Sequence, residues 1–126
     1  MKITIDKRSE KDGFLRIIPY GAIDFTTYQE FDEKIKPLII PPLKGLIIDL
    51  VNVDYISSSG LGSLLSAKKA VLKINGQLIF CNLKPQIKKL FEILRALPAE
   101  NVFEDIEEAD QYLFRMTNGD KDAAKE

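Results

Sequence analysis

Three consecutive serines followed by two glycines form the stretch whose residue types could do chemistry, residues 55–62 (YISSSGLG). A serine hydroxyl can attack as a nucleophile, cap a helix, bind phosphate or accept a phosphoryl group. The chain has no histidine, which excludes a Ser-His-Asp triad and a histidine-ligated zinc site. It has no phosphate-loop motif, and Leu65 stands where a dinucleotide-binding fingerprint needs its third glycine. The sequence therefore favours capping, binding or phosphorylation for these serines, with no cofactor and no metal.

The overall composition is that of a globular domain of 126 residues, with 45% apolar and 29% charged residues. A net charge of -1 removes the usual electrostatic case for binding nucleic acid or an anionic membrane. No apolar run approaches the roughly 20 residues of a membrane span, and residues 1–13 lack the apolar core of a signal peptide. Because the single cysteine, Cys81, excludes an internal disulfide, a reduced cytoplasmic compartment is expected.

The elements that must position the serines follow from hydrophobic patterning. Segments 2–6 and 14–20 are β-rich and predict a hairpin, and the nearly continuous apolar runs 45–51 and 77–81 predict strands buried on both faces. Helical spacing of apolar residues predicts four helices between and after these strands. The order β-β-α-β-α-β-α-α indicates one α/β domain, with a mixed, mainly parallel sheet of four to five strands packed against about four helices.

The ends of the predicted helices carry recognisable signals. Thr27 with Glu30 has the pattern of a capping box, and Pro37 should end the helix that it opens. The helix after the serines should stop at Asn75 and Gly76, the third should begin at Pro85, and Asp105 with Glu108 should open the last. The apolar sides of the second and fourth helices are predicted to comprise Leu61, Leu64, Leu65, Val71 and Leu72, and Ala109, Leu113 and Met116.

The serines lie where a buried strand meets a helix, at the carboxyl end of the sheet, which is the usual place of function in α/β folds. On a helical wheel, Gly62, Ser63 and Ser66 fall on the side away from the leucines, so a flat surface of small residues would let another protein approach closely. The alternative interpretation is structural. The serines would cap the helix, the glycines would allow close packing, and the polar side would face solvent.

Residues 49–62 (DLVNVDYISSSGLG) resemble the signature of the STAS family, the bacterial anti-sigma factor antagonists, which typically reads D-L-S-x-V-x-x-x-D-S-S-G-L-G. Three further motifs match the family: G-x-I-D at 21–24, N-G-Q at 75–77 and K-P-x-I-x-x-L-F at 84–91. The resemblance covers about residues 1–117 as a single STAS-like domain and leaves 118–126 as a charged tail that we expect to be frayed.

The resemblance implies a regulatory binding module and no enzyme. In the family, a partner kinase phosphorylates the first serine after the motif's aspartate, which is Ser58 here. The unphosphorylated protein binds an anti-sigma factor, often itself a serine kinase of the GHKL ATP-binding type, and so frees a sigma factor. Phosphorylation blocks binding, and a phosphoserine phosphatase reverses it. The partner-binding surface is expected to comprise Asp24, Ser57, Ser59, Gly60, Leu61, Gly62, Ser63 and Ser66.

One position departs from the family signature, because Ser57 replaces the motif's aspartate and can only cap the helix. Two alternatives therefore stay open. One is a STAS-like scaffold that binds constitutively, or associates weakly with itself, without a phosphoryl switch. The other is a nucleotide- or lipid-binding domain that uses the helix N-terminus as an anion site, although no basic residue lies between Asp49 and Ser66. A serine hydrolase is least favoured, since its only activator, Lys68, would lie on the wrong side of the helix.

Overall fold

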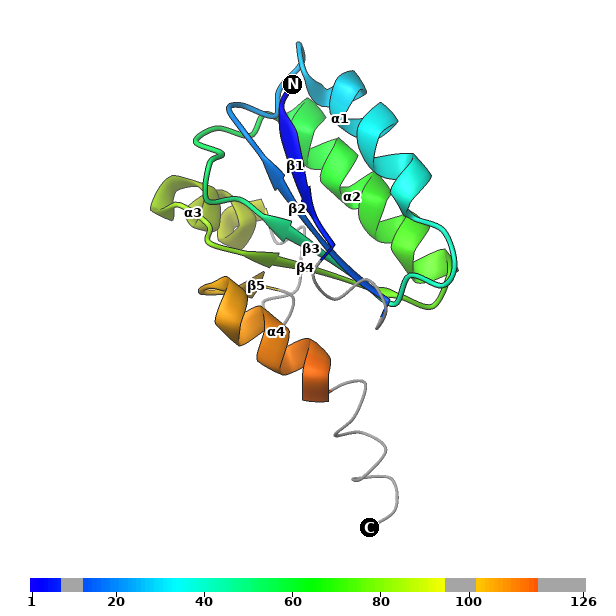
Figure 1. Ribbon diagram of the computed structural model, residues 1–126. Coiled ribbons are helices and arrows are strands. Elements are labelled where there is room, and N and C mark those ends of the chain that lie inside the picture. Colours follow the sequence, from blue (N-terminus) through cyan, green and yellow to red (C-terminus); the bar gives the residue numbers. More distant parts are fainter. Residues whose placement is uncertain (8–12, 95–101, 116–126) are drawn as a thin grey trace.

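The predicted hairpin opens the fold. In the computed structural model, which describes residues 1–7, 13–94 and 102–115, β1 (Ile3–Asp6) and β2 (Phe14–Pro19) pair antiparallel. They lie at one edge of a five-stranded sheet whose spatial order, β1-β2-β3-β4-β5, is also the sequence order (Figure 1).

The remaining strands are parallel to β2, as the alternation of strands and helices predicts. They are β3 (Gly45–Asp49), β4 (Gln77–Cys81) and β5 (Val102–Phe103). The predicted α/β fold is confirmed. The structure adds β5 between the last two helices, and this strand is too short, at two residues, for a hydrophobic pattern to reveal it.

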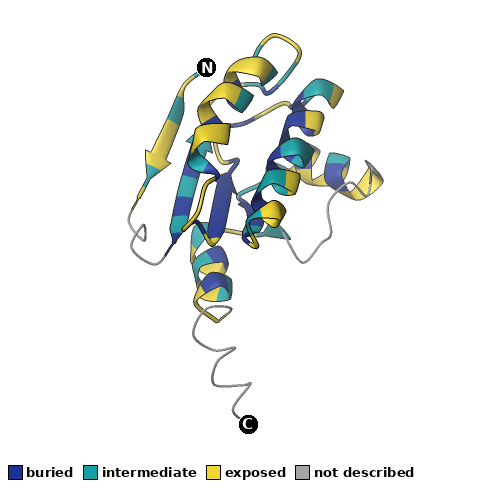
Figure 2. Cartoon of the chain, turned by 90° about the vertical axis from the view of Figure 1, so that its right-hand side faces the viewer, coloured by how far each residue is buried: buried dark blue, intermediate teal, exposed yellow. Residues whose placement is uncertain are grey.

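Helices cover the two faces of the sheet unequally. The main core lies between one face and the helices α1 (Tyr28–Ile35), α2 (Ser58–Lys73) and α3 (Pro85–Leu94), because alternate strand residues pack there. A smaller core on the other face packs Ile47, Ile79 and Cys81 against α4 (Ile106–Phe114). The strand β3 is buried along its whole length, as its apolar run predicts (Figure 2).

The predicted capping box of α1 is wrong. Thr27 occupies the cap position, but its side chain makes no capping hydrogen bond. Its hydroxyl instead donates to the Ala22 carbonyl at 2.7 Å and accepts the Asp24 N–H at 3.0 Å, which ties it to the preceding turn. The α-helix does end just before Pro37 and continues as the 3₁₀ turn η2 (Lys36–Leu38), as expected where a proline cannot continue an α-helix.

The other helix signals agree with the structure at most positions. The helix α2 ends before Asn75, which adopts a positive φ of 60°, and the Asp105 carboxylate accepts the Glu108 N–H at 2.9 Å as the cap of α4. The prediction for Leu72 is wrong, since this side chain is 54% exposed near the C-terminal end of α2. Met116 and the predicted tail 118–126 lie outside the described residues. Among the residues that the structure describes, no helix is long and apolar enough to cross a membrane.

Candidate functional site

The chain leaves β3 at Asp49 and reaches α2 through a loop that lies beside the segment following β2. Isolated parallel bridges join Tyr20 to Asn52 and Ile23 to Ile56. The Ile23 N–H donates to the Tyr55 carbonyl at 3.0 Å, and the Ile23 carbonyl accepts the Ser57 N–H at 3.0 Å. These bonds bring the first turn after β2, which begins at Asp24, against the start of α2. Two candidate segments more than 30 residues apart in sequence therefore form one site.

The three serines have different surroundings. The Ser57 hydroxyl accepts the Gly60 N–H at 3.2 Å and is the N-cap of α2, as the sequence predicts. Ser57 and Ser59 are half-buried, whereas Ser58, the first residue of the helix, is exposed. Of the three hydroxyls, that of Ser58 is the one most open to another molecule.

Asp24 is held in a defined orientation beside these serines. Its carboxylate accepts the hydroxyl of Thr26 at 2.7 Å and the backbone N–H of Thr26 at 2.8 Å. These hydrogen bonds to Thr26 lower the pKa of Asp24. The site therefore presents a fixed negative charge at neutral pH.

The two glycines of the motif have opposite surroundings. A Cβ added at Gly60 would lie 1.9 Å from the Ile23 carbonyl oxygen, so this glycine allows α2 to pack against the loop. A Cβ added at Gly62 would meet no atom within 4 Å. Glycine lowers helix stability, and no close packing within this chain requires a glycine at position 62. The exposed backbone at Gly62 is therefore a candidate contact surface for another protein.

Three residues of the predicted partner surface are buried. Gly60 packs as just described, and Leu61 is 8% exposed within the main core. The prediction that Ser63 faces solvent is wrong, because Ser63 is 3% exposed and its hydroxyl points to the Tyr28 carbonyl of α1. A helical wheel cannot show that α1 lies over this side of α2. Among the predicted positions, Asp24, Ser57, Ser58, Ser59, Gly62 and Ser66 keep exposed or half-buried surface.

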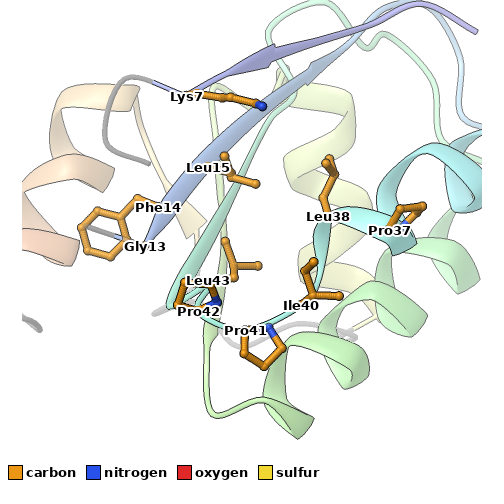
Figure 3. A pocket seen from close by; sticks show the side chains of 10 residues that line it. All are labelled: Lys7, Gly13, Phe14, Leu15, Pro37, Leu38, Ile40, Pro41, Pro42 and Leu43. Carbon is orange, nitrogen blue, oxygen red and sulfur yellow. The ribbon is translucent and has the colours of Figure 1, made fainter. Parts of the chain in front are cut away.

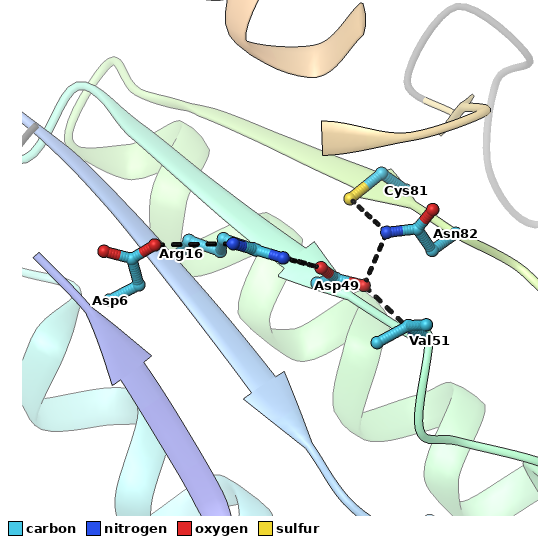
Figure 4. A network of polar contacts seen from close by, with 6 residues as sticks. All are labelled: Asp6, Arg16, Asp49, Val51, Cys81 and Asn82. Atoms are coloured by element: carbon cyan, nitrogen blue, oxygen red, sulfur yellow. Dashed lines mark hydrogen bonds and ion pairs between the residues drawn. The ribbon is translucent and has the colours of Figure 1, made fainter. Parts of the chain in front are cut away.

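A buried carboxylate that the sequence analysis missed fixes the start of the loop (Figure 4). Asp49 has no exposed surface, and its carboxylate accepts four donors. Arg16 binds one oxygen through Nε, at 3.0 Å, and Nη2, while the Val51 N–H and the Asn82 amide each bind the other at 3.0 Å. Charged residues inside two apolar strands were the available signal. Local sequence patterns could not predict that Arg16 and Asp49, 33 residues apart, would pair.

Two exposed aromatic side chains next to the serines were also missed. Phe25 is 77% exposed in the turn after Asp24, and Tyr55 is 57% exposed in the loop before Ser57. Their signal in the sequence is an aromatic residue directly after an aspartate, in a turn or loop.

The family model of the STAS domain matches residues 7–109. The chain belongs to the STAS domain family.

Relatives of this STAS domain include regulators of sigma factors. It is 31% identical over 93 residues to BtrV, a candidate anti-sigma factor antagonist of Bordetella bronchiseptica, and the match covers 74% of this chain and 78% of that protein. It is 28% identical over 93 residues to the anti-sigma-B factor antagonist of Staphylococcus aureus, covering 74% of this chain and 85% of that protein. The predicted family resemblance is thus confirmed.

Solved structures of the anti-sigma factor antagonist SpoIIAA share the fold. The unphosphorylated form gives a TM-score of 0.68 at 19% identity, covering 90% of this STAS domain and 98% of SpoIIAA. The phosphorylated Bacillus form gives 0.70 at 18% identity, covering 89% and 99%. This STAS domain therefore resembles the backbones of both forms about equally.

An apolar pocket of about 230 Å³ lies at the opposite end of the sheet of this STAS domain (Figure 3). It lies beside Phe14, the first residue of β2, whereas the serines follow the carboxyl end of β3. None of the predicted site residues lines the pocket. The lining residues are Lys7, Gly13, Phe14, Leu15, Pro37, Leu38, Ile40, Pro41, Pro42 and Leu43. Within residues 1–7, 13–94 and 102–115, no group of three His, Cys, Asp or Glu side chains is placed to hold a metal ion.

Proposed function

We propose that this STAS domain is an anti-sigma factor antagonist that binds its partner through the start of α2 and the adjoining Asp24 turn. The observation that carries the proposal is the position of Ser58, exposed at the first turn of α2 beside a fixed carboxylate and the open backbone of Gly62. The curated relatives that are named anti-sigma factor antagonists support it.

The partner is an anti-sigma factor that also carries a serine kinase domain of the GHKL ATP-binding type, and both act in the cytoplasm. The unphosphorylated domain binds this partner and frees a sigma factor. The chain itself is a binding module and no enzyme, which agrees with its lack of histidine.

Ser58 is the proposed phosphoacceptor. The Ser57 hydroxyl is engaged with the Gly60 N–H, and Ser59 is half-buried, so the Ser58 hydroxyl is the one that a kinase reaches most readily. A phosphoserine phosphatase would restore the binding form.

The test uses an anti-sigma factor with a GHKL-type kinase domain from the same organism, purified and mixed with the STAS domain and ATP. Intact-mass analysis should show one added phosphate, which Ser58→Ala should abolish. Ser59→Ala is the matched control and should leave phosphorylation intact. Phosphate on Ser57 or Ser59 would contradict the assignment of the acceptor.

A second candidate is a STAS scaffold that binds its partner without a phosphoryl switch. The observation that favours it is Ser57, whose side chain caps α2 where the family signature has an aspartate. If an acidic neighbour orients the acceptor, transfer to Ser58 should be slow and Ser57→Asp should accelerate it. A partner that binds tightly but transfers no phosphate, even to the Ser57→Asp variant, would favour the scaffold.

A further inference from the structure

Phe25 is the most exposed large apolar side chain among the residues that the structure describes, at 77%. Single exposed apolar residues are common on protein surfaces and need no explanation, and Ile93 at 66% is an example here. Phe25 differs because a second exposed aromatic ring, that of Tyr55, lies on the neighbouring segment. The Ile23–Ile56 bridge places these two segments side by side, with Asp24 and Ser57 just beyond the bridge.

The turn that carries Phe25 is held by hydrogen bonds on both sides of it. The Asp24 carbonyl accepts the Thr27 N–H at 3.1 Å, and the Thr27 hydroxyl donates to the Ala22 carbonyl at 2.7 Å. The Phe25 ring packs only loosely on Tyr28, with centroids 6.2 Å apart. The ring is therefore presented to solvent from an ordered backbone, which lowers the entropic cost of burying it in a partner.

The charge of this surface restricts what can bind it. The two segments that build it, 17–33 and 45–67, contain no lysine and no arginine, and they carry the exposed or half-buried acidic residues Asp24, Asp32, Glu33 and Asp54. Glu30, also on the first segment, is paired with the N-terminal ammonium. A second copy of this chain would present the same acidic surface in a two-fold contact, and the like charges would repel. A nucleic acid would be repelled for the same reason.

We propose that Phe25 and Tyr55 are the aromatic anchors by which this STAS domain selects its anti-sigma factor, and that the anti-sigma factor meets them with an apolar pocket bordered by basic side chains. This inference rests on the proposed function, because both anchors lie on the two segments that build the Ser58 site. Aromatic residues supply a large part of the binding energy at many protein interfaces, and basic residues around the pocket would pair with Asp24. Phosphorylation of Ser58 would then add negative charge to the surface that carries the anchors.

Site-specific photo-crosslinking in the native host tests the location of the surface. The photoreactive p-benzoylphenylalanine replaces Phe25 or Tyr55 in the full chain. The same replacement at Leu72 and Ile93, which are 54% and 66% exposed elsewhere, provides matched controls. Leu72 lies about 20 Å from Ser58 along α2 at the rise of an α-helix. We expect adducts from positions 25 and 55 that mass spectrometry identifies as a protein with a GHKL-type ATP-binding domain, and none from the controls.

Affinity measurements with that purified anti-sigma factor test the energetic role of the anchors. Phe25→Ala and Tyr55→Ala should each raise the Kd by about 30-fold or more, as expected for residues that dominate an interface. Ile93→Ala should change it by less than about twofold. Because all three side chains are largely exposed, circular dichroism of each variant should stay native.

The alternative outcomes separate this inference from the proposed function. If the anti-sigma factor binds but both alanine variants bind as tightly as the wild type, or if it crosslinks only from Leu72 or Ile93, the anchors are wrong and the antagonist role stands. If positions 25 and 55 crosslink only to a second copy of the chain or to an unrelated protein, both proposals fail.

Discussion

At Gly60 the backbone of α2 lies so close to the Ile23 carbonyl that an added Cβ would stand 1.9 Å from its oxygen. Gly60→Ala should therefore force backbone atoms apart and lower the free energy of unfolding by about 2 kcal/mol or more. Gly62→Ala is the matched variant two residues further along α2, where nothing lies within 4 Å, and it should raise stability by about 0.5–1 kcal/mol. Urea titrations of both variants measure these changes. A Gly60→Ala variant that is more stable than the wild type would contradict the close approach of α2 to the Ile23 carbonyl.

The thiol of Cys81 is a second residue-scale test. Burial, and then the negative charge of Asp49, raise the pKa of Cys81 to about 12. Since an unfolded thiol loses its proton above about pH 9, the unfolded state is favoured between about pH 9 and pH 12, by up to about 1.4 kcal/mol per pH unit. This contribution to stability is complete below pH 9 and is lost as the pH rises to about 12. Cys81→Ala should remove that part of the alkaline slope in denaturant titrations.

At the scale of elements, the Asp49 carboxylate connects β2, the end of β3 and the residue after β4 to the loop that leads to Ser58. Asp49→Ala should leave the Arg16 guanidinium without its buried counter-charge and should cost about 3–5 kcal/mol of stability. Asp6→Ala is a suitable control, because Asp6 contacts the same guanidinium at 3.4 Å from a partly exposed position on β1 and should cost less than about 1 kcal/mol.

Hydrogen exchange distinguishes a loss of global stability from a loss of loop order in the Asp49→Ala variant. We expect the amide of Val51, which donates to the Asp49 carboxylate, to lose protection even when the core of α2 keeps it. Unchanged protection at Val51 would mean that the carboxylate does not hold the loop.

The helix ends also show which parts of this structure could be predicted from sequence. The caps at Ser57 and Asp105 were predictable because donor and acceptor lie within three residues of each other. The lack of a capping bond at Thr27 was not predictable, since its hydroxyl binds the Ala22 carbonyl and the Asp24 N–H outside the helix. Ser63 was misplaced for a related reason, because its burial depends on how α1 lies against α2.

In the candidate site, too, local features were predictable from the sequence and long-range contacts were not. The family signature identifies Ser58, and the G-x-I-D motif identifies Asp24, but only the pairing of Ile23 with Ile56 shows that the segments carrying them are neighbours. The roles of Gly60 and Gly62 cannot be separated in the sequence, because both are glycines of one motif and differ only in what surrounds them. Long-range contacts decide every one of these points.

At the scale of the whole molecule, the remaining question is how a phosphate on Ser58 would act. A phosphoserine adds about -1.5 to -2 charge at pH 7. At the first residue of α2 the helix dipole favours that charge by roughly 0.3–1 kcal/mol, while the neighbouring Asp24 carboxylate repels it. These opposing effects are local and small compared with the stability of a domain, so the backbone and the melting temperature should hardly change.

Partner binding responds differently to the same phosphate. A dianion buried against another protein must lose its hydration, which costs several kcal/mol unless a cation meets it. Even about 3 kcal/mol would weaken binding more than a hundredfold. We therefore expect phosphorylated and unphosphorylated domains to have nearly the same melting temperature and backbone amide spectra, with shifts confined to residues 20–28 and 51–66 around Ser58, while the Kd for the anti-sigma factor rises by at least a hundredfold. Ser58→Ala, treated with kinase in the same way, is the control and should show neither change. The first turn of α3 adjoins the loop, because the Gln86 amide donates to the Asp54 carbonyl at 3.2 Å, so shifts there count as local. Widespread amide shifts in β4, α4 or the rest of α3 would instead indicate a conformational switch.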